Sequence, residues 1–360
     1  MKKFLLPLVP VFLSAFAASS ASAGLFPFPI AVNGDDVTVA FAADTSWLSG
    51  EASEHLYLQN GAIEGVSGGR RLSRIDWDLR NVWLVGGAGS IRTCHFSLNA
   101  GIWGGAGFKA SGTMESRNWA ADGASGTDGR LADAADGLSR CDATVTSAFI
   151  VDGNASFDLF GGDRAFSLYP FAGVRMERFE WEAENGWTAT GGIRSETPGK
   201  HVKYNMECVQ PYVGLGGSVA VGRRFALSAY GRFSPVYRAK DRDKRLAREC
   251  VSENRTDRDW LDDVAYGAGL RAEWALKPGL SLAASLDWSR YAFAKTKTTV
   301  LDSGVEDDTL SDEAEDGNGG EKGGEIRGKT RKKGKNDEAG TFGGLELENL
   351  TVSLGVIWRF

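Results

Sequence analysis

The last ten residues of the chain place the strongest constraint on its fold. From Thr351 to Phe360, apolar side chains occupy every second position, at Val352, Leu354, Val356, Trp358 and Phe360. Since successive side chains of a strand point to opposite faces, this pattern predicts a strand with one apolar face. A terminal strand that ends in phenylalanine also resembles the signal read by barrel-assembly machinery. We therefore expect that machinery as a partner and a closing barrel strand at 344–360.

The N-terminus has the pattern of an export signal. A positive start, Met1-Lys2-Lys3, precedes an apolar run from Phe4 to Ala17, and Ala21-Ser22-Ala23 precedes Gly24. A charged start, a short apolar core and a small-residue cleavage site are the three parts of a signal peptide. We predict a signal peptide at 1–23 and one mature domain at 24–360. The predicted location is the outer membrane of a Gram-negative-type bacterium.

Period-two segments recur throughout the mature chain, separated alternately by short and long connectors. They predict an all-β fold, an antiparallel transmembrane β-barrel of about ten long strands with extended extracellular loops. The expected strands are 36–57, 70–86, 91–115, 138–160, 165–184, 199–220, 225–243, 258–276, 280–298 and 344–360. Long loops are expected at 58–69, 116–137, 185–198, 244–257 and 299–343. Several strands exceed the ~9–11 residues that cross a bilayer, so their ends should project outside.

Composition excludes several classes of function. The formal net charge of −6 argues against nucleic acid as a partner. The four cysteines, Cys94, Cys141, Cys208 and Cys250, leave three possible disulfide pairings open. They show no Cys-x-x-Cys spacing, so we expect no metal site.

The segment from Arg74 to Arg80 alternates charged residues with Ile75, Trp77 and Leu79. If the apolar set faces lipid, Arg74, Asp76, Asp78 and Arg80 face the lumen, where opposite charges would pair. About sixteen strands are usual for an open pore, so a barrel of about ten strands predicts a crowded lumen. A polar lumen face with no role beyond stability explains the same pattern.

Several stretches, in order along nearly the whole mature chain, resemble the omptin family of outer-membrane endopeptidases. They are Leu48-Ser49-Gly50 with Glu54 and Tyr57-Leu58, Asp76-Trp77 after Leu72-Ser73, Met114 with Trp119, Pro211 to Leu215, Phe225 to Asp243 and Leu350 to Phe360. The resemblance implies a surface protease of aspartic type that uses water as the nucleophile and recognises basic residues of peptides. In that family an aspartate pair faces a histidine and its aspartate across a cleft.

The resemblance assigns the acids that bind a basic side chain to Glu54 and Asp241, and the aspartate beside the histidine to Asp243. Omptins also bind lipopolysaccharide through outward basic residues, which implies it as a partner that activity could require, with no other cofactor. Arg178 matches one such position, although an ordinary rim arginine would look the same. A second matching position is Glu207, which has the wrong sign for phosphate.

The remaining catalytic positions depart from the family. Its histidine falls on Arg245, and its paired aspartates fall on Ser116 and Asn118. Arginine stays protonated in proteins, so it cannot serve as a general base. Serine and asparagine can bind a water but carry no negative charge. These substitutions predict a pseudoprotease that binds basic peptides without cleaving them.

Two rival hypotheses remain. Counting strictly from Phe96 puts Glu115 rather than Ser116 in the lumen, unless a bulge lies between Gly104 and Gly112. An active endopeptidase with a rearranged site could then use Glu115 with His55, although His55 should face away from Glu54. The third hypothesis is a structural or adhesive barrel that acts through its loops.

The segment 299–343 is acidic from Asp302 to Asp316 and basic from Lys322 to Lys335, with glycines throughout. Such a sequence buries too little apolar surface to order itself, so we expect a disordered, solvated loop. A sharper alternative is contact with lipopolysaccharide phosphates or a host polymer.

If the loop is disordered, trimming residues 301–340 should leave the thermal unfolding temperature nearly unchanged. A large decrease would show instead that the loop packs as a plug or lid.

Overall fold

The structure, a computed structural model, describes residues 37–58, 71–93, 95–105, 110–119, 137–160, 166–245, 250–256, 264–302 and 341–360. At 58, 245, 250–256, 294–302 and 341–342 it describes the backbone only. The predicted signal peptide, most of the predicted disordered loop and Cys94 lie outside the described residues. Within them, Cys141 and Cys208 are buried free thiols.

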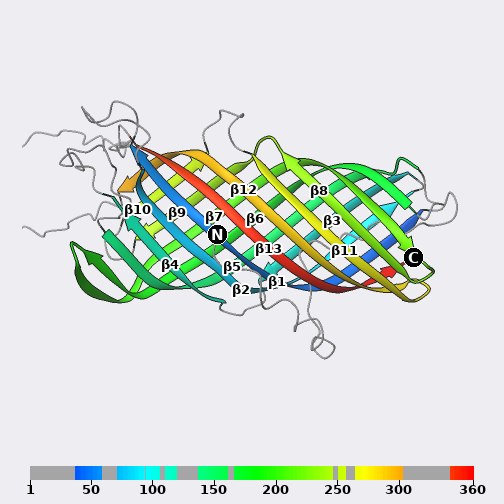
Figure 1. Ribbon diagram of the computed structural model, residues 1–360, viewed down its shortest axis with the longest axis horizontal. Coiled ribbons are helices and arrows are strands. Elements are labelled where there is room, and N and C mark those ends of the chain that lie inside the picture. The colour runs from blue at the N-terminus through cyan, green and yellow to red at the C-terminus, as the bar shows by residue number, and fades with distance from the viewer. Residues whose placement is uncertain are drawn as a thin grey trace, which may run out of the picture.

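The described residues form one antiparallel sheet that closes into a barrel (Figure 1). Its strands are β1 (Thr38–Leu58), β2 (Arg71–Arg92), β3 (Phe96–Gly105), β4 (Ala110–Asn118), β5 (Gly137–Phe157), β6 (Phe166–Thr190), β7 (Ile193–Val221), β8 (Phe225–Ser234), β9 (Arg238–Arg245), β10 (Cys250–Thr256), β11 (Ala265–Lys277), β12 (Leu280–Asp302) and β13 (Thr341–Arg359).

Three pairs of short strands each act as one interrupted strand. Both β3 and β4 lie between β2 and β5, both β8 and β9 pair with β7, and both β10 and β11 pair with β12. The wall therefore contains ten long strand paths, which confirms the predicted number. The described part of the chain contains no helix that is long and apolar enough to cross a membrane.

The two ends of the barrel differ in their connections. At the end where the C-terminus lies, the turns are short, and Gly222 and Gly279 supply the positive φ values of 70° and 74° that these turns need (Figure 1). At the other end, the predicted loop at 185–198 is wrong. Strands β6 and β7 continue as a paired hairpin to a turn at Gly191 and Gly192, because both glycines adopt the positive φ of a tight hairpin turn.

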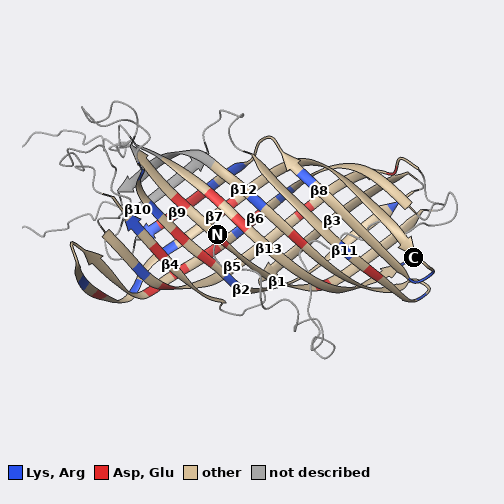
Figure 2. Cartoon of the chain, in the orientation of Figure 1, with Lys and Arg blue, Asp and Glu red and all other residues tan. Residues whose placement is uncertain are grey.

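The outer wall near the short turns is apolar. Its apolar side chains are exposed and alternate with buried neighbours, as the predicted period-two segments require. Examples are Phe41, Leu98, Ile102, Leu227, Leu270, Leu282, Leu354 and Trp358. Figure 2 shows few charged residues on this part of the wall and many toward the end that carries β4, β9 and β10. The barrel thus has an apolar membrane belt and a charged half that projects into water.

The segment from Arg74 to Arg80 reverses its predicted orientation. Ile75, Trp77 and Leu79 are buried inside the barrel, while the alternating charged residues lie on the outer wall. The prediction that those charges line the lumen is wrong, because this part of β2 lies above the apolar belt, where the outer wall meets water. Asn81, with a φ of 56°, marks a bulge below which Val82 and Leu84 face inward.

Opposite charges do pair inside the barrel, but they come from other strands. The Arg175 guanidinium lies 2.6 Å from Glu177, 3.4 Å from Asp152 and 3.8 Å from Asp287. Arg232 lies 3.1 Å from Asp287, and Tyr212 donates to Asp152 at 2.5 Å. All of these side chains are buried, so the lumen at the level of the membrane belt is filled by an ionic network. Removing one partner of such a pair typically costs about 3–5 kcal/mol.

The first and last strands close the barrel. Strands β1 and β13 pair from Ala40 with Arg359 to Leu58 with Thr341. Beyond that ladder, Phe360 exchanges two backbone hydrogen bonds with Val39, of 2.8 and 3.2 Å, and its ring lies edge-on to Phe41 with centroids 6.3 Å apart. The start of β1 and the last residue of the chain are therefore held together by backbone and aromatic contacts at the end with the short turns.

Deleting Phe360 should reduce the folded fraction, because it removes these two hydrogen bonds and an aromatic contact from the closing strand. The measurement is the heat-modifiable, membrane-inserted fraction on gel electrophoresis. Phe225→Ala, which removes an outward aromatic ring at the same end but away from the β1–β13 pairing, is the control. Equal folded fractions for the wild type and the deletion would contradict the prediction.

Candidate functional site

The inner faces of the projecting strand ends carry the residues expected to form a site. Two interruptions of the wall bring these residues inward. Trp103 on β3 is buried in the lumen, and so are Ala110 and Met114 on β4. Since 103 and 110 differ in parity, the alternation changes phase between β3 and β4. Ser116 therefore shares the inward face of β4, as the expected irregularity between Gly104 and Gly112 requires.

A second change of phase occurs at Pro235. On β8 the inward residues are Arg232 and Ser234, whereas on β9 they are Ala239, Asp241 and Asp243. Proline cannot donate to a ladder hydrogen bond and so favours such a break. Strand β9 then alternates buried residues inside with exposed Arg238, Lys240, Arg242 and Lys244 outside. Asp241 and Asp243 are thereby placed inside the rim, 1% and 2% exposed.

Both acids expected to bind a basic side chain interact with Tyr204. Tyr204 on β7 donates its hydroxyl to Asp241 Oδ2 at 3.0 Å. Burial first, and then the negative charges of Asp241 and Glu54, raise the pKa of Tyr204 well above its usual range. Glu54 reaches this point from β1, whose inward alternation continues through Leu48 and Ala52. Asp241 therefore accepts the Tyr204 hydroxyl hydrogen bond, and the charge of Glu54 acts on the same tyrosine.

An aromatic layer supports this acidic group. The rings of Trp77 and Tyr204 stack in parallel with centroids 4.8 Å apart and planes 4° apart. Trp181 contacts both rings, at 6.0 Å from Trp77 and 5.5 Å from Tyr204. Its indole nitrogen donates to the Asp78 carbonyl at 3.1 Å. Because Trp77 lies on β2, Trp181 on β6 and Tyr204 on β7, the layer connects three strands across the lumen.

Strand β4 supplies the opposite part of the rim. Strands β5, β6 and β7 lie between β4 and β9 on one side of the ring. Ser116 is half-buried on the inward face and pairs with Ile75, and Asn118 is exposed at the end of the strand. Glu115 lies on the outer wall, where it pairs with Arg117 and stands opposite Asp76. The structure therefore separates Glu115 from the acids inside the rim.

His55 also lies on the outer wall, as predicted from its position next to Glu54. It is only 2% exposed, because Tyr57 and Phe293 cover it with ring centroids 6.1 and 5.7 Å away. Neither ring nitrogen has a hydrogen bond, and Glu346 lies 3.9 Å from Nε2. Burial, reinforced by Arg71 and Arg74 and opposed by Asp76, lowers the pKa of His55 to about 4. A buried, outward histidine cannot act on a substrate inside the cleft.

The remaining predicted site residues lie at the end of β9 and on the outer wall. Arg245 is the last residue of β9 and pairs with Val202, but its side chain lies outside the described residues. Arg178 points outward and forms an ion pair with Glu180 at 2.6 Å. Among the side chains that the structure describes, no three acids, histidines or cysteines are arranged to hold a metal ion.

Sequence reasoning missed the aromatic layer. It assigned Trp77 to the lipid face, and it did not consider Tyr204 or Trp181. These residues lie on strand ends that extend beyond the length needed to cross a bilayer. There the outer wall meets water, so the apolar residues of a strand face inward. The strand lengths were therefore the available signal. The pairing of Trp77 with Tyr204 was not predictable, because these residues come from strands that are not neighbours.

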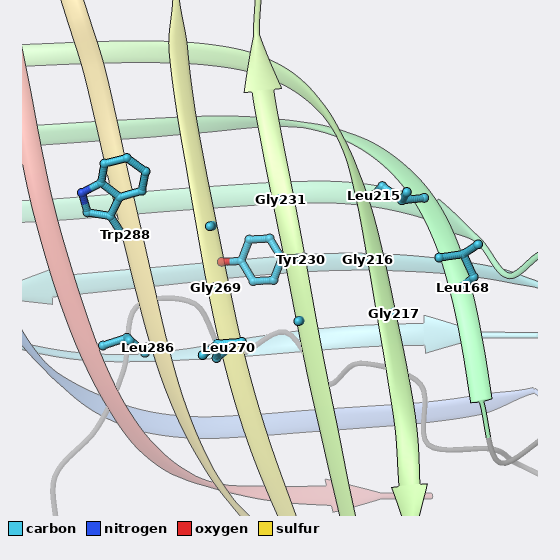
Figure 3. A pocket seen from close by; sticks show the side chains of 12 residues that line it. Leu168, Leu215, Gly216, Gly217, Tyr230, Gly231, Gly269, Leu270, Leu286 and Trp288 are labelled. Atoms are coloured by element: carbon cyan, nitrogen blue, oxygen red, sulfur yellow. The ribbon is translucent and has the colours of Figure 1, made fainter.

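A hollow of about 500 Å³ on the outer wall is a different kind of site (Figure 3). Gly217, Gly231 and Ala268 contribute to its floor, and Leu215 and Leu270 to its sides. Its lining contains no charged residue, and Leu215, Leu270 and Leu286 belong to the exposed apolar belt. This hollow therefore faces lipid and cannot hold a basic peptide.

A ten-path antiparallel barrel with an apolar belt, a filled lumen and acids inside a projecting rim defines a transmembrane β-barrel of the outer-membrane type. The omptin family model matches residues 35–319. The chain belongs to the omptin family. It is similar to the plasminogen activator of Yersinia pestis, 28% identical over 313 residues, which cover 84% of this chain and 90% of that protein.

Two further comparisons agree. The outer membrane protease OmpP of Escherichia coli strain K12 is 25% identical over 268 residues, which cover 71% of this chain and 78% of that protein. The crystal structure of the outer membrane protease OmpT from Escherichia coli matches with a TM-score of 0.69 and 19% identity, covering 91% of this chain and 97% of that one. The structural match supports the fold, and the family places the chain in the outer membrane.

His55 should make the fold sensitive to mild acid. Its pKa of about 4 in the folded protein lies below its ordinary value of 6.5, so the unfolded chain takes up the proton first. The free energy of unfolding should therefore decrease as the pH falls from 6.5 to about 4. His55→Phe should weaken this decrease. The measurement is the thermal unfolding temperature against pH, and parallel profiles for the two proteins would assign the acid sensitivity to other groups.

Proposed function

We propose that this barrel captures basic peptide segments at the cell surface and holds them without hydrolysing them. The observation that supports binding is the Tyr204 hydroxyl inside the rim, which donates to Asp241 and is also acted on by the charge of Glu54, with Asp243 on the same face of β9 as Asp241. Two carboxylates in a partly dehydrated cleft attract a lysine or arginine side chain more strongly than they would in bulk water. A basic residue of an exposed peptide is therefore the ligand that this group fits.

The types of residue at the other family positions support the absence of hydrolysis. An aspartic-type mechanism needs a carboxylate or a neutral histidine to take a proton from the attacking water. Ser116 and Asn118 carry no charge, and Arg245 holds its proton at any pH at which the protein is folded. Each substituted position can bind a water or a carbonyl oxygen, but none can accept the proton.

The rearranged-protease hypothesis has less support. It depends on Glu115 and His55, and both side chains lie on the outer wall. A structural or adhesive barrel remains the alternative to peptide capture. It would require no acidic group inside the rim, so the presence of that group favours capture.

Lipopolysaccharide is a further proposed partner. Arg178, Glu207 and Lys240 lie side by side on β6, β7 and β9, so the unfavourable Glu207 is flanked by two cations. The outward side of β9 adds Arg238, Arg242 and Lys244. Such a row can contact phosphate groups above the membrane, and purified protein should be tested with and without lipopolysaccharide.

The binding test uses a fluorescent peptide with two adjacent arginines and the folded barrel. Wild-type protein should bind the peptide and leave it intact, and Glu54→Gln should weaken binding by about tenfold or more, because it removes one of two charges. Glu115→Gln, which removes a carboxylate from the outer wall, is the matched control and should bind like the wild type. Binding that is insensitive to Glu54 would contradict the proposed pocket.

The catalytic test restores the family residues with the triple change Ser116→Asp, Asn118→Asp and Arg245→His. General-base catalysis is typically worth about 10²–10⁴-fold, so the triple variant should cleave the peptide measurably faster than the wild type. Mass spectrometry of the products separates cleavage at the basic pair from background hydrolysis. Rapid cleavage by the wild type, abolished by Glu54→Ala, would refute the proposal of a non-hydrolytic barrel.

A further inference from the structure

Tyr204 is neither one of the family's acids nor its histidine, but it contacts one of the acids. It lies on β7, at the register position opposite Asp243 on β9 and Trp181 on β6. Its side chain is 1% exposed, because the aromatic layer covers it. Its hydroxyl is nevertheless directed to Asp241, the acid expected to contact the ligand's basic side chain.

We propose that Tyr204 is a positioning residue for the acidic pocket, holding Asp241 ionised and oriented toward a bound cation; this inference rests on the proposed peptide capture. The hydroxyl can donate one hydrogen bond, and it donates it to Asp241 Oδ2 at 3.0 Å. A donor to a carboxylate favours its charged form, so the bond opposes the effect of burial on Asp241, which is 1% exposed.

The ring of Tyr204 is itself fixed. Trp77 stacks on it in parallel at 4.8 Å, and Trp181 contacts it at 5.5 Å. Because Trp77 comes from β2, next to the β1 strand that carries Glu54, the stack also connects the two walls that hold the acids. The Trp77–Tyr204 pair therefore fixes the direction of the hydroxyl and the spacing of the acidic pair.

If Tyr204 holds Asp241 ionised, binding of the basic peptide should depend on pH. Among the side chains that the structure describes, the titratable groups near Asp241 include Glu54 from β1, Tyr204 and Cys208 from β7, and Asp243 from β9 itself. Of these, Tyr204 donates the hydrogen bond to the carboxylate. Without that bond, Asp241 should take up a proton at a higher pH. Cation binding should then fail at a higher pH as the solution is acidified.

The experiment compares Tyr204→Phe with the wild type, using the full barrel and the fluorescent diarginine peptide between pH 5 and pH 8. The variant keeps the ring and its stacking but lacks the hydroxyl. We expect binding at pH 7 to weaken by about tenfold, since hydrogen bonds to charged groups are worth about that factor or more. We also expect the acid limb of the binding curve to move to higher pH.

Tyr212→Phe is the matched control. It also removes a buried tyrosine hydroxyl that donates to an aspartate, Asp152, but it lies in the ionic network at the membrane belt. It should change stability without moving the pH profile of binding. An unmoved profile for Tyr204→Phe, or the same movement for both variants, would overturn the inference.

The outcomes also separate this inference from the function on which it rests. If wild-type protein binds no basic peptide at any pH, the proposed capture fails. If wild-type protein binds and Glu54→Gln weakens binding, but Tyr204→Phe binds with the wild-type affinity and pH profile, capture holds and the role of Tyr204 is wrong. A folding defect in Tyr204→Phe is detected by heat modification, and Tyr204→Trp, which restores an N–H donor on a stacking ring, should then recover part of the affinity.

Discussion

The closed ring of backbone hydrogen bonds is the constraint on which the rest of the structure depends. In lipid no water can satisfy a free N–H or C=O group, so a sheet that crosses the membrane must pair every edge. Here the pairing of β1 with β13 brings the first and last described strands together and closes the ring. Once the ring is closed, each side chain points either into the lumen or outward. Alternate residues of every strand must therefore suit these two environments.

The outside changes from lipid to water along the barrel, and this change explains the polarity of the two halves. In the belt, apolar residues such as Leu270 and Leu354 face outward and the ionic network around Arg175 lies inside. Above the belt, the aromatic layer lies inside and charged residues cover the outside. The acids Asp241 and Asp243 are therefore exceptions in the upper lumen. Burying an ionised carboxylate costs free energy unless the group is paired or hydrogen-bonded, and Asp241 accepts the hydroxyl hydrogen bond of Tyr204.

The interruptions of the strands determine which residues line the rim. A shift of one residue moves a whole strand segment from one face to the other. The changes of phase between Trp103 and Ala110, and between Ser234 and Tyr237, place Ser116 and Asp241 inward. The same rule leaves Glu115 and His55 on the outer wall. The chemistry of the cleft therefore depends on two local irregularities as much as on the residues themselves.

The sequence alone determined the antiparallel barrel, its number of strand paths and the apolar outward face of its closing strand. These follow from a period of two, from strand lengths and from turn residues, all of which are local properties. The tertiary structure decided the orientation of Arg74 to Arg80, the continuous hairpin at 185–198 and the stack of Trp77 on Tyr204. It did so because the polarity of the outer medium, the phase of interrupted strands and the distance across the lumen are fixed only when the ring closes.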